Sequence, residues 1–190
     1  MPQGILRPAR GTLLVARPHL LDPNFMRTVV LLCDHDDERG TFGFVLNRPS
    51  GKGLAEVLRD GSAFEGRDDP VFAGGPVGLD SLAILHREEG IPGSMEILPG
   101  VMLGGDVDVL GARFREGSAP GGAPRFVVGY SGWGEGQLAR EMTEDTWVVC
   151  PAEARWVFDP EPATLWSRVL RSMGGEYRMW ALSPADPELN

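Results

Sequence analysis

Residues 28–47, which read TVVLLCDHDDERGTFGFVLN, decide what kind of fold this chain adopts. The run at 28–33 is continuously β-branched and aliphatic, as expected of a strand that is covered on both faces. The polar segment 34–40 ends in glycine and predicts a hairpin-type connection, after which 41–47 reads as the returning strand. Arg48-Pro49-Ser50-Gly51 should stop that strand. The stretch therefore predicts a pair of adjacent strands.

Further elements extend this pair in both directions. Apolar runs bounded by glycine and proline predict strands at 12–16, 70–73, 81–86, 95–98, 101–103, 125–130, 146–150 and 177–182. One-sided apolar spacing or a leading proline predicts helices at 53–59, 106–114, 134–142, 151–156 and 162–173. Asp106 can cap its helix, and the composition of 116–124 predicts a flexible loop. Because the elements lack regular βαβ spacing, we expect an α+β fold with a strongly bent, mixed or antiparallel sheet.

Length and composition fit one globular domain. The chain has 190 residues, and we expect residues 1–182 to form one domain and 183–190 to be a frayed acidic tail. The formal net charge of −9 argues against binding driven by the phosphate backbone of nucleic acids. The beginning of the sequence lacks the apolar stretch of a secretory signal, and the longest apolar run, Val29 to Cys33, is too short to span a bilayer. We therefore expect a cytoplasmic protein.

Cysteines and acidic residues do not predict a metal site. Cys33 and Cys150 each adjoin an apolar stretch, which favours two buried free thiols over a disulfide. The cluster at 34–38, DHDDE, offers oxygen ligands and the imidazole of His35, but its spacing does not match a calcium loop. The composition of this cluster favours a solvated turn over a metal site. We expect no metal site and no bound cofactor.

The segment GYSGWGEGQ at 129–137 follows a predicted strand and opens a helix. Backbone N–H groups in such a place can hold an anion, which gives a binding loop as one interpretation. Gln137 stands where a dinucleotide-binding fingerprint needs its third glycine, and Trp133 stands where a nucleophile elbow needs its last one. The alternative is a turn that needs positive φ angles while Trp133 packs inward.

Two more segments could border a site. Leu46 to Gly53 resembles a phosphate-binding loop but lacks its first glycine and its Ser or Thr, so Asn47 and Arg48 either face a cleft or bond to nearby backbone. Gly74-Gly75-Pro76 permits a tight turn or a close backbone approach, and its X-Pro bond is a candidate for the cis form. His86 ends an apolar strand, where a structural histidine is commoner than a catalytic one.

A hydrolytic triad is one combination of these residues. Ser131 together with His35 or His86, and with Asp34, has the required chemistry, because triads are recognised by geometry and not by chain order. The sequence offers no positive sign that these side chains meet. The catalytic assignment therefore stays open.

With these motifs in view, the sequence resembles the YqgE/AlgH family of bacterial proteins over nearly its whole length. The resemblance rests on GTLLVARPHLLDPNFMRTVVLL, DHDDERGTFGFVLNRP, AGGPV, LAILHR, GYSGWGEGQLAREMTEDTWVVCPA and VFDPEPATLWSRVLRSMGG, in this order. It implies a bent sheet folded into a pseudo-barrel flanked by helices. One branch of the family has been named as a transcriptional regulator of alginate synthesis, although this chain carries no helix-turn-helix signature.

The family's motif residues can be placed on this sequence one by one. They are His35, Gly40, Gly43, Asn47, Pro49, Gly74, Gly75, Pro76, His86, Gly129, Gly132, Trp133, Gly136, Gln137, Leu138, Glu141 and Trp147. Thr41 and Ala139 depart from the usual residues. No catalytic residue of the family is established, so the resemblance transfers none.

Three functional hypotheses follow. The first is a binding or regulatory protein that acts through a ligand pocket or a protein partner. The candidate binding residues are His35, Asn47, Gly74, Gly75, Pro76, His86, Gly132, Trp133, Gly136, Gln137 and Glu141. The second is a small-molecule hydrolase or transferase that uses His35, His86 or Ser131. The third is a DNA-binding regulator, which the net charge disfavours. The partner and the oligomeric state stay open.

Overall fold

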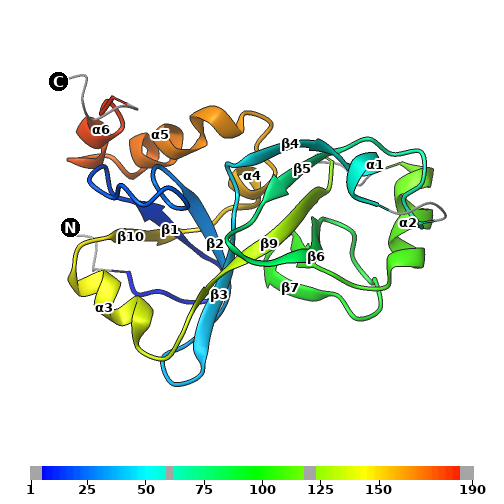
Figure 1. Cartoon of the computed structure of the whole chain (residues 1–190), viewed down its shortest axis with the longest axis horizontal. Helices are drawn as coiled ribbons and strands as arrows, with labels where there is room; N and C mark the ends of the chain where they lie inside the picture. The colour runs from blue at the N-terminus through cyan, green and yellow to red at the C-terminus, as the bar shows by residue number, and fades with distance from the viewer. Residues whose placement is uncertain (1–5, 59–61, 118–122, 185–190) are drawn as a thin grey trace.

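The hairpin predicted around residues 28–47 lies inside a single curled sheet. The computed structural model describes residues 6–58, 62–117 and 123–184, and its strands and helices form an α+β fold (Figure 1). The strands are β1 (Thr12–Ala16), β2 (Val29–Asp36), β3 (Gly40–Val45), β4 (Pro49–Gly53), β5 (Pro70–Ala73), β6 (Val77–His86), β7 (Met95–Leu98), β8 (Val101–Leu103), β9 (Arg125–Trp133) and β10 (Trp147–Pro151). The helices are α1 (Leu54–Val57), α2 (Val107–Glu116), α3 (Gln137–Thr143), α4 (Ala154–Val157), α5 (Pro162–Met173) and α6 (Tyr177–Trp180).

Strand β9 joins the two halves of the sheet. The strand order is β10-β1-β2-β3-β9-β6-β8-β7, with β4 attached to β5 and β5 parallel to β9. Residues 125–130 of β9 pair with β6, whereas 131–133 pair with β3, so one strand passes from the first half to the second (Figure 1). Every other pairing is antiparallel. The predicted α+β class and the strongly bent mixed sheet are confirmed.

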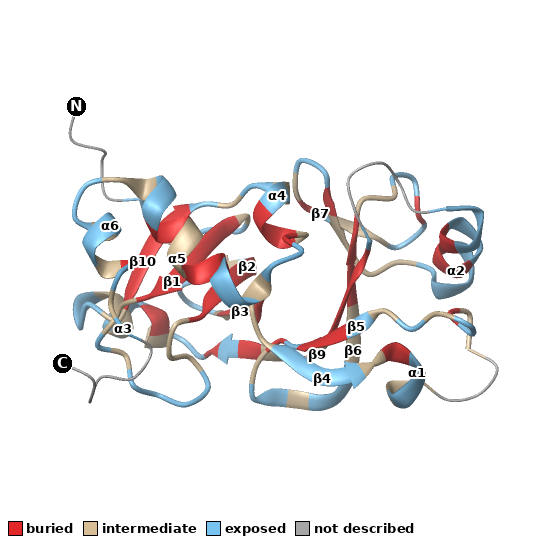
Figure 2. Cartoon of the chain, turned by 90° about the horizontal axis from the view of Figure 1, so that it is seen from above, coloured by how far each residue is buried: buried red, intermediate tan, exposed pale blue. Residues whose placement is uncertain are grey.

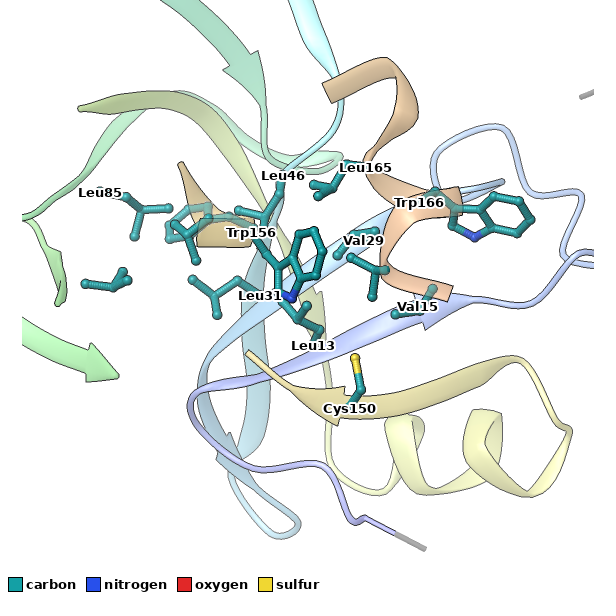
Figure 3. Packing of buried hydrophobic residues seen from close by; sticks show 14 of the residues in the cluster. Leu13, Val15, Val29, Leu31, Leu46, Leu85, Cys150, Trp156, Leu165 and Trp166 are labelled. Carbon is teal, nitrogen blue, oxygen red and sulfur yellow. The ribbon is translucent and has the colours of Figure 1, made fainter. Parts of the chain in front are cut away.

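The core explains why β2 has no polar face. Val29, Leu31 and Cys33 belong to a cluster with α4 and α5, while Val30 and Leu32 belong to a cluster on the α3 side. In the first cluster Trp156, Leu165 and other helix residues pack on the sheet (Figure 3). A third cluster lies around α1 and α2 at the far end of the molecule (Figure 2). Both faces of the strand are thus buried, as its continuous apolar run predicts.

Two elements differ from the sequence prediction. Residues 49–53 form β4 instead of only stopping a strand. Proline and glycine are tolerated there because, within residues 6–58, 62–117 and 123–184, this strand pairs only with β5. The strand predicted at 177–182 is wrong, because 177–180 form the helical turn α6. Aromatic residues are typical of strands, but at positions i and i+3 of this helical turn the rings of Tyr177 and Trp180 meet edge to face, 5.0 Å between centroids.

Smaller differences concern helix starts and one peptide bond. Helix α3 begins at Gln137 and not at 134, because Gly136 stands before it with φ +64°. The Gly75–Pro76 bond is not cis, since the described residues contain no cis peptide bond. Asp106 caps α2 as predicted, with its side chain accepting from Asp108 N and Val109 N.

Some predictions fall partly outside the described residues. Residues 118–122 of the predicted loop, residues 59–61 at the end of the predicted helix, and 185–190 of the predicted tail belong to this group. The start of that tail is held in place, because Arg27 Nη1 donates to the carbonyl oxygens of Ser183 and Pro184 at 2.7 and 3.1 Å.

Candidate functional site

Two tryptophans of the motif region share one carboxylate. Trp133 ends β9 and Trp147 begins β10, and their indole N–H groups donate to Glu141 Oε2 at 2.9 and 2.7 Å. Gln137, one turn earlier on α3, donates from Nε2 to Glu141 Oε1 at 3.0 Å. A carboxylate has only acceptor sites, so Glu141 satisfies all three donors. We call these residues the indole–carboxylate cluster; it ties β9, α3 and β10 together.

The cluster is closed off from most of the surface. Trp133 and Trp147 are 4% and 2% exposed, and their rings meet edge to face at 6.0 Å between centroids. Phe25 packs on both rings, at 6.0 and 5.6 Å. Gln137 Oε1 accepts from Gly134 N at 3.1 Å, which fixes the turn before α3. The polar groups of these motif residues therefore form their hydrogen bonds within the protein. Trp133 packs inward, as the second interpretation of this segment predicts.

The backbone of Gly74-Gly75-Pro76 passes very close to the backbone of β9. Gly74 donates to Val128 O at 2.8 Å, and its own carbonyl oxygen accepts from Val45 N at 2.9 Å. A Cβ atom on Gly75 would lie 2.3 Å from the carbonyl carbon of Tyr130, and Gly75 has φ +152°. Of the two roles considered for this segment, the close backbone approach is the one observed.

Asn47 bonds to the backbone of a neighbouring segment. Its Oδ1 accepts from Val29 N and its Nδ2 donates to Arg27 O, both at 2.9 Å. Arg48 donates to the carbonyl oxygens of Pro23 and Met26 at 2.9 and 3.0 Å. Both polar residues of the LNRP motif thus hold the chain that leads into β2.

The residues of the considered triad are engaged elsewhere. Ser131 is fully buried, and its hydroxyl donates to Gly74 O at 3.0 Å. His35 Nδ1 lies 2.6 Å from Thr41 Oγ1, and its Nε2 lies 3.6 Å from Asp37 Oδ1. Within the described part of the chain no hydrogen bond joins Ser131 to a histidine, so these side chains do not form a nucleophile and base pair.

His86, the last residue of β6, is also fully buried. Its Nε2 lies 2.7 Å from Gly104 O and its Nδ1 accepts from Glu88 N at 3.2 Å. The carbonyl needs a proton on Nε2 and the amide needs a lone pair on Nδ1, which together specify the neutral ring. Burial lowers the pKa of His86 from its ordinary value, against the opposing effect of the Gly104 bond. The motif histidine therefore acts as a neutral bridge between β6 and the end of β8.

This bridge gives a first prediction, that acid destabilises the fold through His86. The unfolded chain takes up a proton near pH 6.5, whereas the folded ring resists it, so the free energy of unfolding should fall as the pH drops below 6.5. The contribution of one histidine is at most about 1.4 kcal/mol per pH unit. Urea unfolding of the wild type and of His86→Gln checks this. If both proteins lose stability equally between about pH 7 and about pH 5, the assignment is wrong.

An open hollow of about 450 Å³ lies where the two halves of the sheet meet. It is lined by Asp34, Arg39, Gly40, Thr41, Phe42, Val77, Tyr130, Gly132, Trp133 and Gly134. Phe42 and Tyr130 meet edge to face at 6.4 Å between centroids. Phe42 pairs with Gly132 across β3 and β9, and a Cβ on Gly132 would lie 3.3 Å from the Tyr130 ring. Because Gly132 has no side chain, this side of the Tyr130 ring is left uncovered. We call the site the aromatic hollow.

The border of the hollow is part charged and part apolar. Arg39 pairs with Asp36, with 2.7 Å between Nη2 and Oδ2, and this bond lowers the pKa of Asp36 to about 2. Val77 lines the hollow and is 40% exposed, and Leu79, two residues further along β6, is 68% exposed. Leu79 lies against the backbone of β9, because its Cδ2 is 3.1 Å from where a Cβ on Gly129 would stand.

Of the candidate binding residues, Gly132 and Trp133 line the hollow, together with the motif residue Gly40. Gln137 and Glu141 lie in the indole–carboxylate cluster, and Gly136 directly precedes α3. Gly74, Gly75 and Pro76 lie at the close approach to β9, and His86 is fully buried. His35 and Asn47 are half-buried and bond to Thr41 and to the chain that leads into β2. The sequence reasoning did not single out Phe42, Tyr130, Val77 or Leu79. A signal was present for Tyr130, which stands two residues before Gly132 and so shares its face of a strand.

No group of three His, Cys, Asp or Glu side chains placed to hold a metal ion occurs in residues 6–58, 62–117 and 123–184. Both cysteines are free and buried, as predicted, and burial raises the pKa of Cys150 to about 12. None of the helices in the described ranges is long and apolar enough to cross a membrane.

Comparison with known proteins gives a consistent family. A family model described as AlgH-like matches residues 13–178. A UPF0301 protein of Chlorobaculum tepidum is 42% identical over 187 residues, covering 98% of this chain and 97% of that protein. A UPF0301 protein of Bacteroides fragilis is 36% identical over 96% of this chain and 92% of its own.

Two solved structures are similar along most of the chain. The solution structure of the AlgH protein from Pseudomonas aeruginosa has a TM-score of 0.71 and 30% identity, and the match covers 97% of this chain and 98% of that one. The crystal structure of a Corynebacterium diphtheriae protein has a TM-score of 0.76 over 95% of both chains, and its 24% identity bears on the fold alone.

Proposed function

The chain belongs to the AlgH-like family, and from this premise we propose that it is a binding protein that holds a protein partner in the aromatic hollow. One observation carries the proposal: an aromatic floor that Gly132 leaves open is lined on one side by the exposed Val77, and β6 continues from there to the exposed Leu79. A regulatory role would then act through that partner.

The chemistry of the hollow favours a side chain of a partner protein over a small polar ligand. Phe42 and Tyr130 offer apolar ring surface, and the Tyr130 hydroxyl makes no hydrogen bond within the described residues. Tyrosines of this kind are frequent hot spots of protein interfaces, because one ring supplies apolar area and a polar group. Asp34 and Arg39 give the rim both signs of charge, which suits an amphipathic partner surface.

The motif residues support the proposal indirectly. The indole–carboxylate cluster and Gly74 use their polar groups internally and fix β9, the strand that carries Tyr130 and Gly132. A strand held in this way places the binding residues in advance, which lowers the conformational-entropy cost of association. Catalysis is not required by this arrangement, and the net charge of −9 disfavours a nucleic-acid partner.

A second prediction tests the proposal with matched leucines. Leu79 and Leu182 are 68% and 66% exposed. Leu79 lies on β6 two residues after Val77, which lines the hollow, whereas Leu182 lies after α6. Burying a leucine contributes about 1.5–3 kcal/mol, so Leu79→Asp should weaken partner binding by about tenfold or more, while Leu182→Asp should not. Both variants should unfold like the wild type, since surface changes stay within about 0.5 kcal/mol.

The measurement is quantitative affinity enrichment of proteins from cells that naturally produce the chain. The same three baits, wild type, Leu79→Asp and Leu182→Asp, are compared by mass spectrometry. Proteins kept by the wild type and by Leu182→Asp, but lost by Leu79→Asp, are the expected result. Equal retention by all three baits would show that the aromatic hollow is not the binding site.

A further inference from the structure

The sheet has an open edge at β10, away from the aromatic hollow. Among the described residues strand β10 pairs only with β1, antiparallel, with Val15 opposite Val148 and Leu13 opposite Cys150. Arg17 N donates to Thr146 O and Ala152 N donates to Gly11 O, which fixes the alternation of the ladder. The backbone groups of 146, 148, 150 and 152 therefore point to β1, and those of Trp147 and Val149 point outward. Within the described residues no hydrogen bond involves the N–H groups of Trp147 and Val149.

A groove of about 720 Å³ follows this edge. In Figure 1 β10 runs between α3 on one side and α5 and α6 on the other. Met142 lines the groove at the α3 side, and Met173 and Tyr177 line it at the α5 and α6 side. Methionine side chains adapt to different partners. The 5 residues of β10 span about 17 Å, enough for a short extended peptide.

The charges in the groove specify an uncharged occupant. Its charged lining residues form two ion pairs, Arg17 with Asp145 at 3.1 Å and Arg155 with Glu153 at 2.7 Å. The groove is thus neutral in a chain of net charge −9, and a charged peptide would find no unpaired counter-ion there.

We propose that the β10 edge binds an extended, uncharged apolar segment of another protein by adding it to the sheet as a further strand. The outward N–H and C=O groups of Trp147 and Val149 bond to its backbone. Trp147 and Val149 pack toward the α3 side and Cys150 packs toward α5, so an added strand needs apolar side chains on both faces. This site is independent of the aromatic hollow.

A proline substitution tests strand addition while leaving the hydrogen bonds that hold β10 in the sheet. Val149→Pro removes an outward N–H and leaves the bonds between β10 and β1 in place, and proline is tolerated on edge strands. Met173→Glu puts a charge into the apolar wall without touching the backbone. Met179→Glu, at a methionine that is 68% exposed and outside the groove, is the control.

The probe is a library of random heptapeptides displayed on phage and selected on the wild-type protein. We expect uncharged, β-branched and aliphatic sequences, with binding reduced about tenfold or more by Val149→Pro and by Met173→Glu, and unchanged by Met179→Glu. Enriched peptides that are charged, or that bind Val149→Pro equally well, would overturn the proposal.

Amide hydrogen exchange of residues 147–150 tests whether the peptide binds as an added strand. In the free protein the N–H groups of Val148 and Cys150 should exchange slowly and those of Trp147 and Val149 rapidly, and the selected peptide should slow the latter pair. No change on peptide addition contradicts strand addition. Protection of Trp147 and Val149 without peptide, in a protein that sediments as a dimer, would assign the edge to a second copy of this chain instead.

Discussion

Replacing Gly75 by alanine should remove about 4 kcal/mol or more of the free energy of unfolding. The added Cβ would lie 2.3 Å from the carbonyl carbon and oxygen of Tyr130 and 2.4 Å from Ser131 N. These are backbone atoms of β9, which pairs with β3, β5 and β6 and cannot shift without breaking those ladders. Urea unfolding, with stability extrapolated to water, measures the loss.

Gly51→Ala is the matched control for this substitution. Gly51 also has a positive φ, +78°, but a Cβ there would meet nothing within 4 Å. It should therefore lose only the conformational cost of a left-handed residue, about 1–2 kcal/mol. If Gly75→Ala and Gly51→Ala are equally stable, the motif glycine is not needed for the close approach to β9.

Replacing Glu141 by alanine should cost about 3 kcal/mol of stability. The change leaves the indole N–H groups of Trp133 and Trp147 without their acceptor, in residues that are 4% and 2% exposed. Glu141→Gln keeps the shape of the side chain but brings an amide N–H₂ toward other donors, so it should lose an intermediate amount. Chemical unfolding followed by tryptophan fluorescence reports both the stability and the environment of the rings.

Glu144 provides the control in the same part of the chain. It lies at the C-terminal end of α3, is exposed, and makes no side-chain hydrogen bond within the described residues. Glu144→Ala should change stability by less than about 0.5 kcal/mol. Equal losses in Glu141→Ala and Glu144→Ala would mean that the shared carboxylate does not hold β9 and β10 together.

The local elements were largely predictable, because their signals lie within a few residues. The apolar run of β2 has no polar face because α3 covers one side and α5 the other, and the proline at 162 begins α5 as predicted. Strand β4 and the helical turn α6 were not predictable, because their form depends on neighbours that are distant in sequence: β4 is a strand because it pairs with β5. The passage of β9 between the two halves is likewise a tertiary property.

The residues of the indole–carboxylate cluster were predictable from the sequence, but their arrangement and most residues of the aromatic hollow were not. The i, i+4 spacing of Gln137 and Glu141 is readable from the sequence, but the position of Trp147 next to Trp133 depends on how β10 and β9 are placed. Structural roles are typical of the motif glycines and tryptophans. The structure places several of these glycines in close backbone contacts and the tryptophans in the core. The floor of the hollow pairs Phe42 with Tyr130, from strands far apart in the chain, which no local pattern reveals.

Site-specific photo-cross-linking tests the central claim, that the motif residues build a rigid strand and the aromatic hollow beside it binds a partner. A benzophenone amino acid replaces Leu79 in living cells of the natural source, and Leu182 in the control. We expect a discrete protein adduct from position 79 that is absent from position 182 and disappears when Tyr130→Ala is added. The unfolding curve of Tyr130→Ala must still show a folded protein. Adducts that are the same from both positions, or that persist without the Tyr130 ring, would contradict the account.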